Sequence, residues 1–397
     1  MIKPQPVGHG HSCGQLACGT LGLMQPRHAY VHVPFCRHRC GYCDFTLVAG
    51  RDDLLDRYYA ALQRELDRLV APLSLDTLYL GGGTPSHLGP DGLRRLFTLL
   101  HERLRPVHNA EISVEANPLD VTPEFVTAVR ECGITRVSLG AQSLDATVLA
   151  ALDRDHRPDD VRRAADQLLT SGLTVSLDLM TAAPGQSLAE VEADLSAAVG
   201  LAVEHISVYC LTWEKGTAFE VRRQKGQLQQ VDNAIEQAMF EAAIDRLTAA
   251  GYEHYEVSNF ARPGHRCRHN EAYWDCRPWE AFGPGAARFD GRTRITNHRS
   301  TTTWINRVLA GTDCVGDVDA MSAEAAASER LVVGLRRRAG IDRVAFYAAS
   351  GSDLDRLAGS AIARWIAAGL AEDDGRVLRL TRAGLLVSDS LWADVLP

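Results

Sequence analysis

Apolar runs and amphipathic stretches alternate along the first 260 residues of the chain. The short runs are rich in β-branched residues and predict strands at 30–34, 77–80, 111–115, 136–139, 175–179 and 205–209. The longer stretches between them predict helices at 54–70, 93–104, 123–132, 159–171 and 188–199. Six β–α units in succession favour an α/β fold whose parallel sheet is curled into a full or partial (β/α)6 barrel. In such a barrel the chemistry takes place at the C-terminal ends of the strands.

The regular alternation stops after the sixth predicted strand. Residues 213–230 are polar, and a helix at 231–250 and a strand at 252–257 follow them. The next stretch, 261–320, is rich in glycine, arginine, histidine and aromatic residues and has little periodicity. We expect this stretch to form a long, ordered connecting region.

The last part of the chain, 321–397, has a third pattern. Short helical stretches precede a predicted strand at 376–380 and a final helix, which together resemble a small α+β winged-helix-like domain. The barrel domain is therefore predicted over 30–260. Residues 1–29 hold few charges and many glycines, prolines and histidines, and we expect a dispensable, disordered extension there.

Composition narrows the class of protein. The chain has 397 residues, and its 42 basic and 50 acidic residues give a net charge of −8. A hydrophobic content of 46% excludes general disorder, and the negative charge argues against a nucleic-acid partner. No apolar run reaches 18 residues, so no membrane span is predicted. The N-terminal stretch has no secretory-signal pattern, and we expect a cytoplasmic protein.

Ten cysteines call for a chemical explanation, and three of them follow the first predicted strand as Cys36, Cys40 and Cys43. Clustered cysteines in a long chain indicate metal or redox chemistry in a reducing compartment. Three thiolates at this spacing can bind three irons of a [4Fe–4S] cluster and leave one iron open to a small molecule. A zinc knuckle that uses His38 or His32 as its fourth ligand is the alternative.

Polar residues also follow the later strands. Gly81-Gly-Gly-Thr-Pro-Ser comes after the second strand, and Glu115-Ala-Asn-Pro ends the third. Gln142, Arg154 and Asp178 lie at or beyond the fourth and fifth strands. Since these positions share one end of the barrel, a common ligand explains them better than separate surface roles do. Carboxylates that accept ribose hydroxyls and an arginine that pairs with a carboxylate fit a nucleoside bearing an amino acid.

These motifs resemble the radical S-adenosylmethionine (SAM) superfamily, in its HemN/HemW branch, from Tyr30 to the C-terminus. The most specific stretches are Tyr30-Val-His-Val-Pro-Phe-Cys, Gly81-Gly-Gly-Thr-Pro-Ser, Glu115-Ala-Asn-Pro, Tyr255-Glu-Val-Ser-Asn-Phe-Ala and Phe282-Gly-Pro-Gly-Ala. The resemblance implies a HemN-like C-terminal domain over 321–397. It also implies that Cys36, Cys40 and Cys43 hold a [4Fe–4S] cluster whose open iron binds SAM. The implied SAM contacts are Tyr30, Tyr42, Gly82, Gly83, Thr84, Glu115, Gln142, Arg154, Asp178 and Thr212.

Two functions compete within this branch. Chains that resemble anaerobic coproporphyrinogen III oxidases carry a further cysteine two residues after the third cluster ligand, where this chain has Phe45. Chains of the HemW type, which resemble heme chaperones, read Cys-Asp-Phe there and contain the motif His-Asn-x-x-Tyr-Trp. This motif is matched by His269, Asn270, Tyr273 and Trp274, which the resemblance makes heme contacts. The alternative is that the aromatic residues belong to the core and His269 is an ordinary loop histidine.

The chaperone interpretation has consequences for partners. It implies heme, heme-acceptor proteins such as respiratory ones, and an electron donor such as flavodoxin or ferredoxin. It leaves room for a peripheral membrane contact and does not decide whether SAM is cleaved.

The chain also departs from the pattern of the branch. It has Ala287 where histidine is usual, and Thr181-Ala182-Ala183 where tyrosine, glycine and leucine are usual. We expect these changes to reshape the floor of the pocket. Seven cysteines remain beside the three of the cluster. Cys267 and Cys276 flank the His-Asn-x-x-Tyr-Trp motif, where a second metal site is the alternative to no role. For Cys13 and Cys18, metal or heme binding is the alternative to no role.

Overall fold

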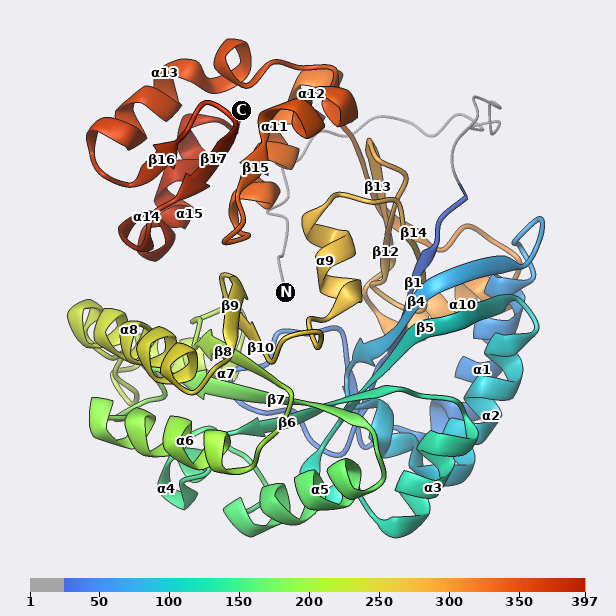
Figure 1. Cartoon of the computed structure of the whole chain (residues 1–397). Helices are drawn as coiled ribbons and strands as arrows, with labels where there is room; N and C mark the ends of the chain where they lie inside the picture. Colours follow the sequence, from blue (N-terminus) through green and yellow to red (C-terminus); the bar gives the residue numbers. More distant parts are fainter. Residues whose placement is uncertain (1–24, 397) are drawn as a thin grey trace.

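A computed structural model describes residues 25–396, and most of its ordered core is a curved sheet (Figure 1). Its six central strands are parallel and neighbouring in sequence order. They are β1 (His28–Val33), β4 (Leu73–Gly82), β5 (Leu104–Ala116), β6 (Arg136–Gln142), β7 (Thr174–Thr181) and β8 (His205–Cys210). The predicted α/β fold with a partial (β/α)6 barrel is confirmed.

Helices cover the outer face of this sheet (Figure 1). They are α1 (Leu55–Leu66), α2 (Gly89–His101), α3 (Pro123–Glu131), α5 (Pro158–Thr170), α6 (Leu188–Gly200) and α8 (Asn233–Ala249). Local sequence fixes their starts. Ser187 and Glu190 form a capping box at α6, and the Thr122 hydroxyl accepts a hydrogen bond from the Phe125 N–H at α3. Their apolar faces pack on the strands in one continuous core.

Short strands extend the sheet at both edges. On one side β11 (Glu280–Phe282) pairs in parallel with β1. On the other side β10 (Asn259–Ala261) is antiparallel to β8 and carries β9 (Glu253–Glu256) at the edge. Because β11 and β9 do not pair, the described barrel is open along one side.

The connecting region beyond the barrel contains more regular structure than its sequence pattern predicts. It contributes β11 to the main sheet and forms a separate antiparallel sheet of β12 (Ala287–Phe289), β13 (Thr293–Asn297) and β14 (Val315–Ala320). It also holds helices α9 (Arg268–Trp274) and α10 (Thr301–Leu309). Strands of three residues are too short for periodicity to reveal.

The C-terminal domain has its own core, which includes Leu331, Trp365 and Leu378. Helices α11 (Ala323–Leu335), α12 (Arg343–Ser350) and α13 (Leu354–Ala367) pack on a small antiparallel sheet. That sheet consists of β15 (Ile341–Asp342), β17 (Val377–Leu380) and β16 (Ala371–Asp373), and α14 (Arg382–Leu386) and α15 (Ser388–Leu391) follow. None of the helices described between residues 25 and 396 is both long and apolar enough to cross a membrane.

Most of the predicted elements agree with the structure to within a few residues. The sequence pattern missed α4 (Ala146–Ala151) and α7 (Ala218–Gln224), which have only six and seven residues. The extension predicted over 1–29 lies largely outside the described residues, as do Cys13 and Cys18, and β1 already begins at His28.

Candidate functional site

The three clustered cysteines lie on a loop at the C-terminal end of β1. Two short strands close this loop, because β2 (Phe35–Cys36) pairs in parallel with β3 (Val48–Ala49). The Arg39 guanidinium donates hydrogen bonds to the carbonyls of Cys43 at 3.1 Å and Leu47 at 2.9 Å. Cys36 and Cys40 are 7% and 8% exposed, so the thiols face the protein more than the solvent. The loop is therefore held in one shape by its own backbone.

Two polar side chains from outside the cysteine loop reach the cysteine sulfurs. The Thr84 Oγ1 atom lies 3.1 Å from Cys36 Sγ, and Arg154 Nη1 donates to Cys40 Sγ at 3.4 Å. Burial raises the pKa of the Cys36 thiol to about 12. A buried thiol of this kind is deprotonated when it ligates a metal, which supplies the missing positive charge.

The glycine run after β4 packs against protein atoms. A Cβ atom on Gly81 would lie 2.7 Å from Glu115 Oε1, and one on Gly82 would lie 2.3 Å from the His32 ring. A Cβ atom on Gly83 would lie 2.8 Å from the Phe35 carbonyl oxygen. The absence of side chains thus lets β4 end tightly against β1 and the cysteine loop.

Two carboxylates face the inside of the barrel from β5 and β7. Glu115 accepts hydrogen bonds from the Gly82 N–H at 3.0 Å and the Tyr79 hydroxyl at 3.1 Å. Asp178 accepts one from the Ser138 hydroxyl at 3.0 Å. Burial raises the pKa of Glu115 to about 7, with the nearby Asp178 charge adding to the effect, and burial raises the pKa of Asp178 to about 6. These carboxylates have hydroxyl and N–H donors but no cationic partner among the described ion pairs.

The remaining residues expected to contact SAM lie around the same end of the barrel. Gln142 ends β6 with a φ of +64°. The side chains of Gln142 and Arg154 both lie close to Gly140, since a Cβ atom there would be 3.3 Å from Gln142 Nε2 and 3.7 Å from Arg154 Nη2. Tyr30, from the middle of β1, stacks on Tyr79 with a centroid distance of 6.2 Å. Thr212 is exposed and donates to Glu214 Oε1 at 3.4 Å, so it stands apart from the others. Tyr42 packs edge-on against Phe219 near the cysteine loop.

These residues fit the cofactors that the motifs imply. Three thiols share one loop, and Arg154 Nε is buried with no hydrogen-bond partner in the described part of the chain. An orphaned guanidinium N–H suits the carboxylate of a ligand such as an amino acid. The set therefore has donors for a cluster and for a nucleoside with an amino-acid end.

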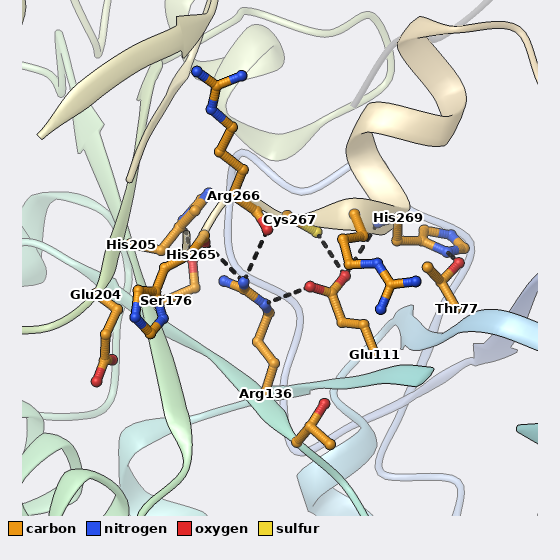
Figure 2. Close-up of polar contacts among 12 residues, drawn as sticks. Thr77, Glu111, Arg136, Ser176, Glu204, His205, His265, Arg266, Cys267 and His269 are labelled. Carbon is orange, nitrogen blue, oxygen red and sulfur yellow. Dashed lines mark hydrogen bonds and ion pairs between the residues drawn. The ribbon is translucent and has the colours of Figure 1, made fainter. Parts of the chain in front are cut away.

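The His-Asn-x-x-Tyr-Trp segment lies at the opposite end of the barrel. Figure 2 shows its start held over the N-terminal ends of the strands by a buried pair, Glu111 of β5 and Arg136 of β6. These two side chains are 8% and 6% exposed and 3.2 Å apart. Arg136 donates to the His265 carbonyl at 2.8 Å, and Glu111 accepts from the His269 N–H at 3.1 Å. Two strand-end charges thus fix the segment that leads into α9.

His269 is buried at 1% exposure, and both of its ring nitrogens have partners. Its Nδ1 lies 2.7 Å from Thr77 Oγ1, which is also 3.0 Å from His28 Nδ1 (Figure 2 shows Thr77). Its Nε2 lies 2.9 Å from the Tyr273 hydroxyl. Burial lowers the pKa of His269 to about 3, so the ring is neutral. In this conformation neither nitrogen is available to an iron.

A row of aromatic rings continues outward from His269. His269 stacks on Tyr79 at 5.2 Å, and Tyr273 lies 4.7 Å from His269 on its other side. Trp279 follows at 4.5 Å from Tyr273, and Phe289 lies 4.9 Å from Trp279. Trp274, by contrast, is buried, and its indole nitrogen has no partner among residues 25–396. Asn270 is half-buried beside His269. The half-buried rings of Tyr273 and Trp279 thus form an aromatic face next to the motif, and the buried Phe289 packs against Trp279.

The two cysteines that flank this motif have separate surroundings. Cys267 Sγ donates to Glu111 Oε1 at 3.5 Å, and Cys276 has a positive φ of +49° just after α9. Within the described residues, no three His, Cys, Asp or Glu side chains come together to hold a single metal ion.

The departures from the branch pattern also have visible surroundings. Ala182 has a φ of +61°, and Thr181 Oγ1 lies 3.3 Å from Cys210 Sγ. The Ala287 carbonyl accepts a hydrogen bond from Trp279 Nε1 at 2.6 Å. Position 287 is therefore beside the aromatic row that starts at His269.

Sequence reasoning missed Thr77, Glu111 and Arg136. Each is the first residue of a predicted strand, where an ionisable or hydroxyl side chain precedes an apolar run. That position was the available signal, since a charge in a strand that is covered on both faces needs a buried partner.

Comparisons with known proteins support the predicted fold and family. Residues 30–198 match the family model of the radical SAM superfamily, and residues 321–387 match that of the HemN C-terminal domain. A protein of Mycobacterium tuberculosis named heme chaperone HemW is 38% identical over 92% of this chain and 94% of its own length. One of Bacillus subtilis with the same name is 32% identical over 92% and 98%. In structure, coproporphyrinogen III oxidase (HemN) from Escherichia coli superposes with a TM-score of 0.83 at 20% identity, over 94% of this chain and 90% of that one.

Proposed function

The chain belongs to the HemW family of radical SAM proteins, and from that membership we propose that it is a heme chaperone which binds heme and transfers it to acceptor proteins. The observation that carries the proposal is the similarity to proteins named heme chaperone HemW along nearly the whole chain, at 38% identity in one of them. Phe45, in place of the further cysteine of the oxidase type, supports it.

We assign the cofactor roles as follows. Cys36, Cys40 and Cys43 hold a [4Fe–4S] cluster, and the ten residues named above as implied SAM contacts bind SAM. When bound, these groups supply one-electron chemistry that the side chains of the protein cannot perform. Glu115 and Asp178 accept hydroxyl hydrogen bonds, and Arg154 pairs with the carboxylate of the ligand.

In the proposal, heme binds at the aromatic face next to the His-Asn-x-x-Tyr-Trp segment. Flat rings suit a macrocycle, and imidazole is a common axial ligand of heme iron. Since the Tyr273 hydroxyl occupies His269 Nε2 at 2.9 Å, ligation by His269 requires that this hydrogen bond be released. Asn270 and Trp274 lie on the same helix and complete the proposed contacts.

The proposal also covers the location of the protein and its partners. We propose a cytoplasmic protein that hands heme to acceptors such as respiratory proteins and takes electrons from a donor such as flavodoxin or ferredoxin. The working domain limits are 30–260 for the barrel, 261–320 for the connecting region and 321–397 for the C-terminal domain.

Hemin titration of anaerobically prepared protein tests the chaperone function. We expect stoichiometric binding in the wild type and a loss of about tenfold or more in affinity in His269→Ala, since one axial bond is lost. Tyr273→Phe removes the competing hydroxyl and keeps the ring, so it should bind hemin at least as tightly as the wild type. Unchanged binding in His269→Ala would remove histidine ligation from the proposal.

The second candidate function is oxygen-independent coproporphyrinogen III oxidation, which the HemN-like fold favours. The same anaerobic sample, reduced and supplied with SAM, would convert coproporphyrinogen III if this function were correct. We expect no product because Phe45 replaces the further cysteine. Analysis of iron, zinc and sulfide in the same sample distinguishes the chaperone and the oxidase from a zinc-stabilised binding protein. Such a binding protein would contain zinc and no sulfide.

A further inference from the structure

Two of the residues expected to contact SAM also touch the cysteine sulfurs. Thr84, at the end of β4, lies 3.1 Å from Cys36 Sγ through its hydroxyl. Arg154, from the loop after α4, donates to Cys40 Sγ at 3.4 Å. A sulfur that ligates iron carries no proton, so the threonine hydroxyl must be the donor when the cluster is bound.

The position of Arg154 is fixed by the barrel itself. Its Nη2 donates to the Gly140 carbonyl of β6 at 2.9 Å, while Nη1 points to Cys40. Within the described part of the chain, no carboxylate lies within ion-pair distance of its guanidinium. The adjacent residue Asp155 instead lies 3.6 Å from His38 Nδ1. The positive charge of Arg154 is thus directed at the cysteine loop without a neutralising partner in contact.

Thr84 is held just as firmly. Its backbone N–H donates to the Phe35 carbonyl at 2.8 Å, next to Cys36 in sequence, and its carbonyl accepts from the His87 N–H at 2.9 Å. The tight end of β4 against the cysteine loop, which Gly83 permits, therefore brings this hydroxyl to the sulfur.

From this geometry we propose that Thr84 and Arg154 are positioning residues which raise the reduction potential of the cluster through hydrogen bonds to two of its three cysteine sulfurs. The inference rests on the cluster assigned under the proposed function. Reduction adds one electron and hence one negative charge to the cluster, and a donor or a positive charge at the sulfurs stabilises that added charge. The effect exists without SAM, which separates it from the role of either residue in SAM binding.

Redox titration of the reconstituted protein without SAM tests the proposal. Titanium(III) citrate supplies the electron and is oxidised to titanium(IV), and the signal of the reduced cluster is followed by electron paramagnetic resonance. Arg154→Gln removes the charge, Arg154→Lys keeps it, and Thr84→Val removes the hydroxyl while keeping the shape. Thr84→Ser restores the hydroxyl. Arg157→Gln is the matched control, because it makes the same charge change three residues away at an exposed side chain.

We expect the midpoint potential to become more negative in Arg154→Gln and Thr84→Val. Arg154→Lys should fall between Arg154→Gln and the wild type, and Thr84→Ser and Arg157→Gln should match the wild type. Equal potentials in all variants that contain a full cluster would overturn the inference. A protein that takes up no iron and sulfide would instead refute the proposed cluster. If Arg154→Gln fails to assemble a cluster, the Thr84→Val and Thr84→Ser pair still decides the question.

Discussion

Ala182 is the clearest case of local strain in the barrel. Its φ of +61° lies in the left-handed region, where a Cβ atom costs about 1–2 kcal/mol, and the HemW pattern has glycine at this position. The residue is buried, at 3% exposure, so the surrounding structure holds this backbone conformation in place.

Ala182→Gly should therefore raise the free energy of unfolding by about 1 kcal/mol. Chemical denaturation of the apo protein measures the change. Ala183→Gly is the control, because Ala183 is buried without a positive φ and its replacement should destabilise the protein. Equal effects of both substitutions would mean that the backbone at Ala182 is not strained.

Ionisation of Glu115 inside the barrel lowers the free energy of unfolding in a pH-dependent way. Burial, together with the charge of Asp178, raises the pKa of Glu115 to about 7, whereas an unfolded glutamate ionises at about 4.3. As the pH rises from about 4 to 7, the unfolded chain loses this proton before the folded chain does, so the stability of the apo protein falls. Above pH 7 this loss of stability is fully present.

Glu115→Gln removes the ionisable group and with it this loss of stability at high pH. We expect the variant to be more stable than the wild type by on the order of 1–2 kcal/mol at pH 8, a discounted figure because the side chain is partly exposed, and to lose the advantage near pH 4. Denaturation curves of the two apo proteins at both pH values measure it. An advantage that does not vary with pH would assign the effect to hydrogen bonding instead of ionisation.

At the scale of elements, the segment that leads into α9 depends on one buried ion pair. Glu111 accepts hydrogen bonds from Arg136, Cys267 and the His269 backbone, so its loss would leave the Arg136 charge buried without a counter-ion. Breaking such a pair costs about 3–5 kcal/mol.

Glu111→Ala should therefore lower the free energy of unfolding by about 3 kcal/mol and speed hydrogen exchange over 267–274. Glu131→Ala breaks the exposed pair with Arg94 and should cost less than about 1 kcal/mol. Exchange in α9 that is as slow in Glu111→Ala as in the wild type would show that other contacts hold the segment.

The same elements show how far the sequence could predict this structure. Amphipathic helices such as α5 and apolar strands such as β7 follow from periodicity, because their burial repeats with the geometry of the element. The cysteine loop and the strand-end carboxylates also follow, since all parallel strands end at one edge of the sheet. The burial of His269 could not be predicted, because its partners Thr77 and Glu111 are 192 and 158 residues away in sequence. The place of β11 beside β1 is equally a product of long-range packing.

At the scale of the whole molecule, α9 links two separate cores. Its start is held by the barrel through Glu111, while Asp275 at its end accepts a hydrogen bond from Arg337, and Arg330 donates to the Asp275 carbonyl at 2.8 Å, both from the α11 side. Other links between the two parts do not involve α9. An ion pair joins Arg382 to Asp245 of α8, and backbone hydrogen bonds join Tyr255 and Val257 to Arg338 and Arg336. The helix that carries His269 and Tyr273 therefore contacts both the barrel and the C-terminal domain.

This arrangement predicts that loosening the Asp275 link opens the proposed heme site. Asp275→Asn weakens the ion pair with Arg337, so α9 should move more readily and release the Tyr273 hydroxyl from His269. Stopped-flow mixing with hemin should then show faster association in Asp275→Asn than in the wild type. Asp245→Asn weakens another link between the same two parts and should leave the rate unchanged. Equal rates in both variants would mean that the ion pair of Asp275 with Arg337 does not control the access of heme to its site.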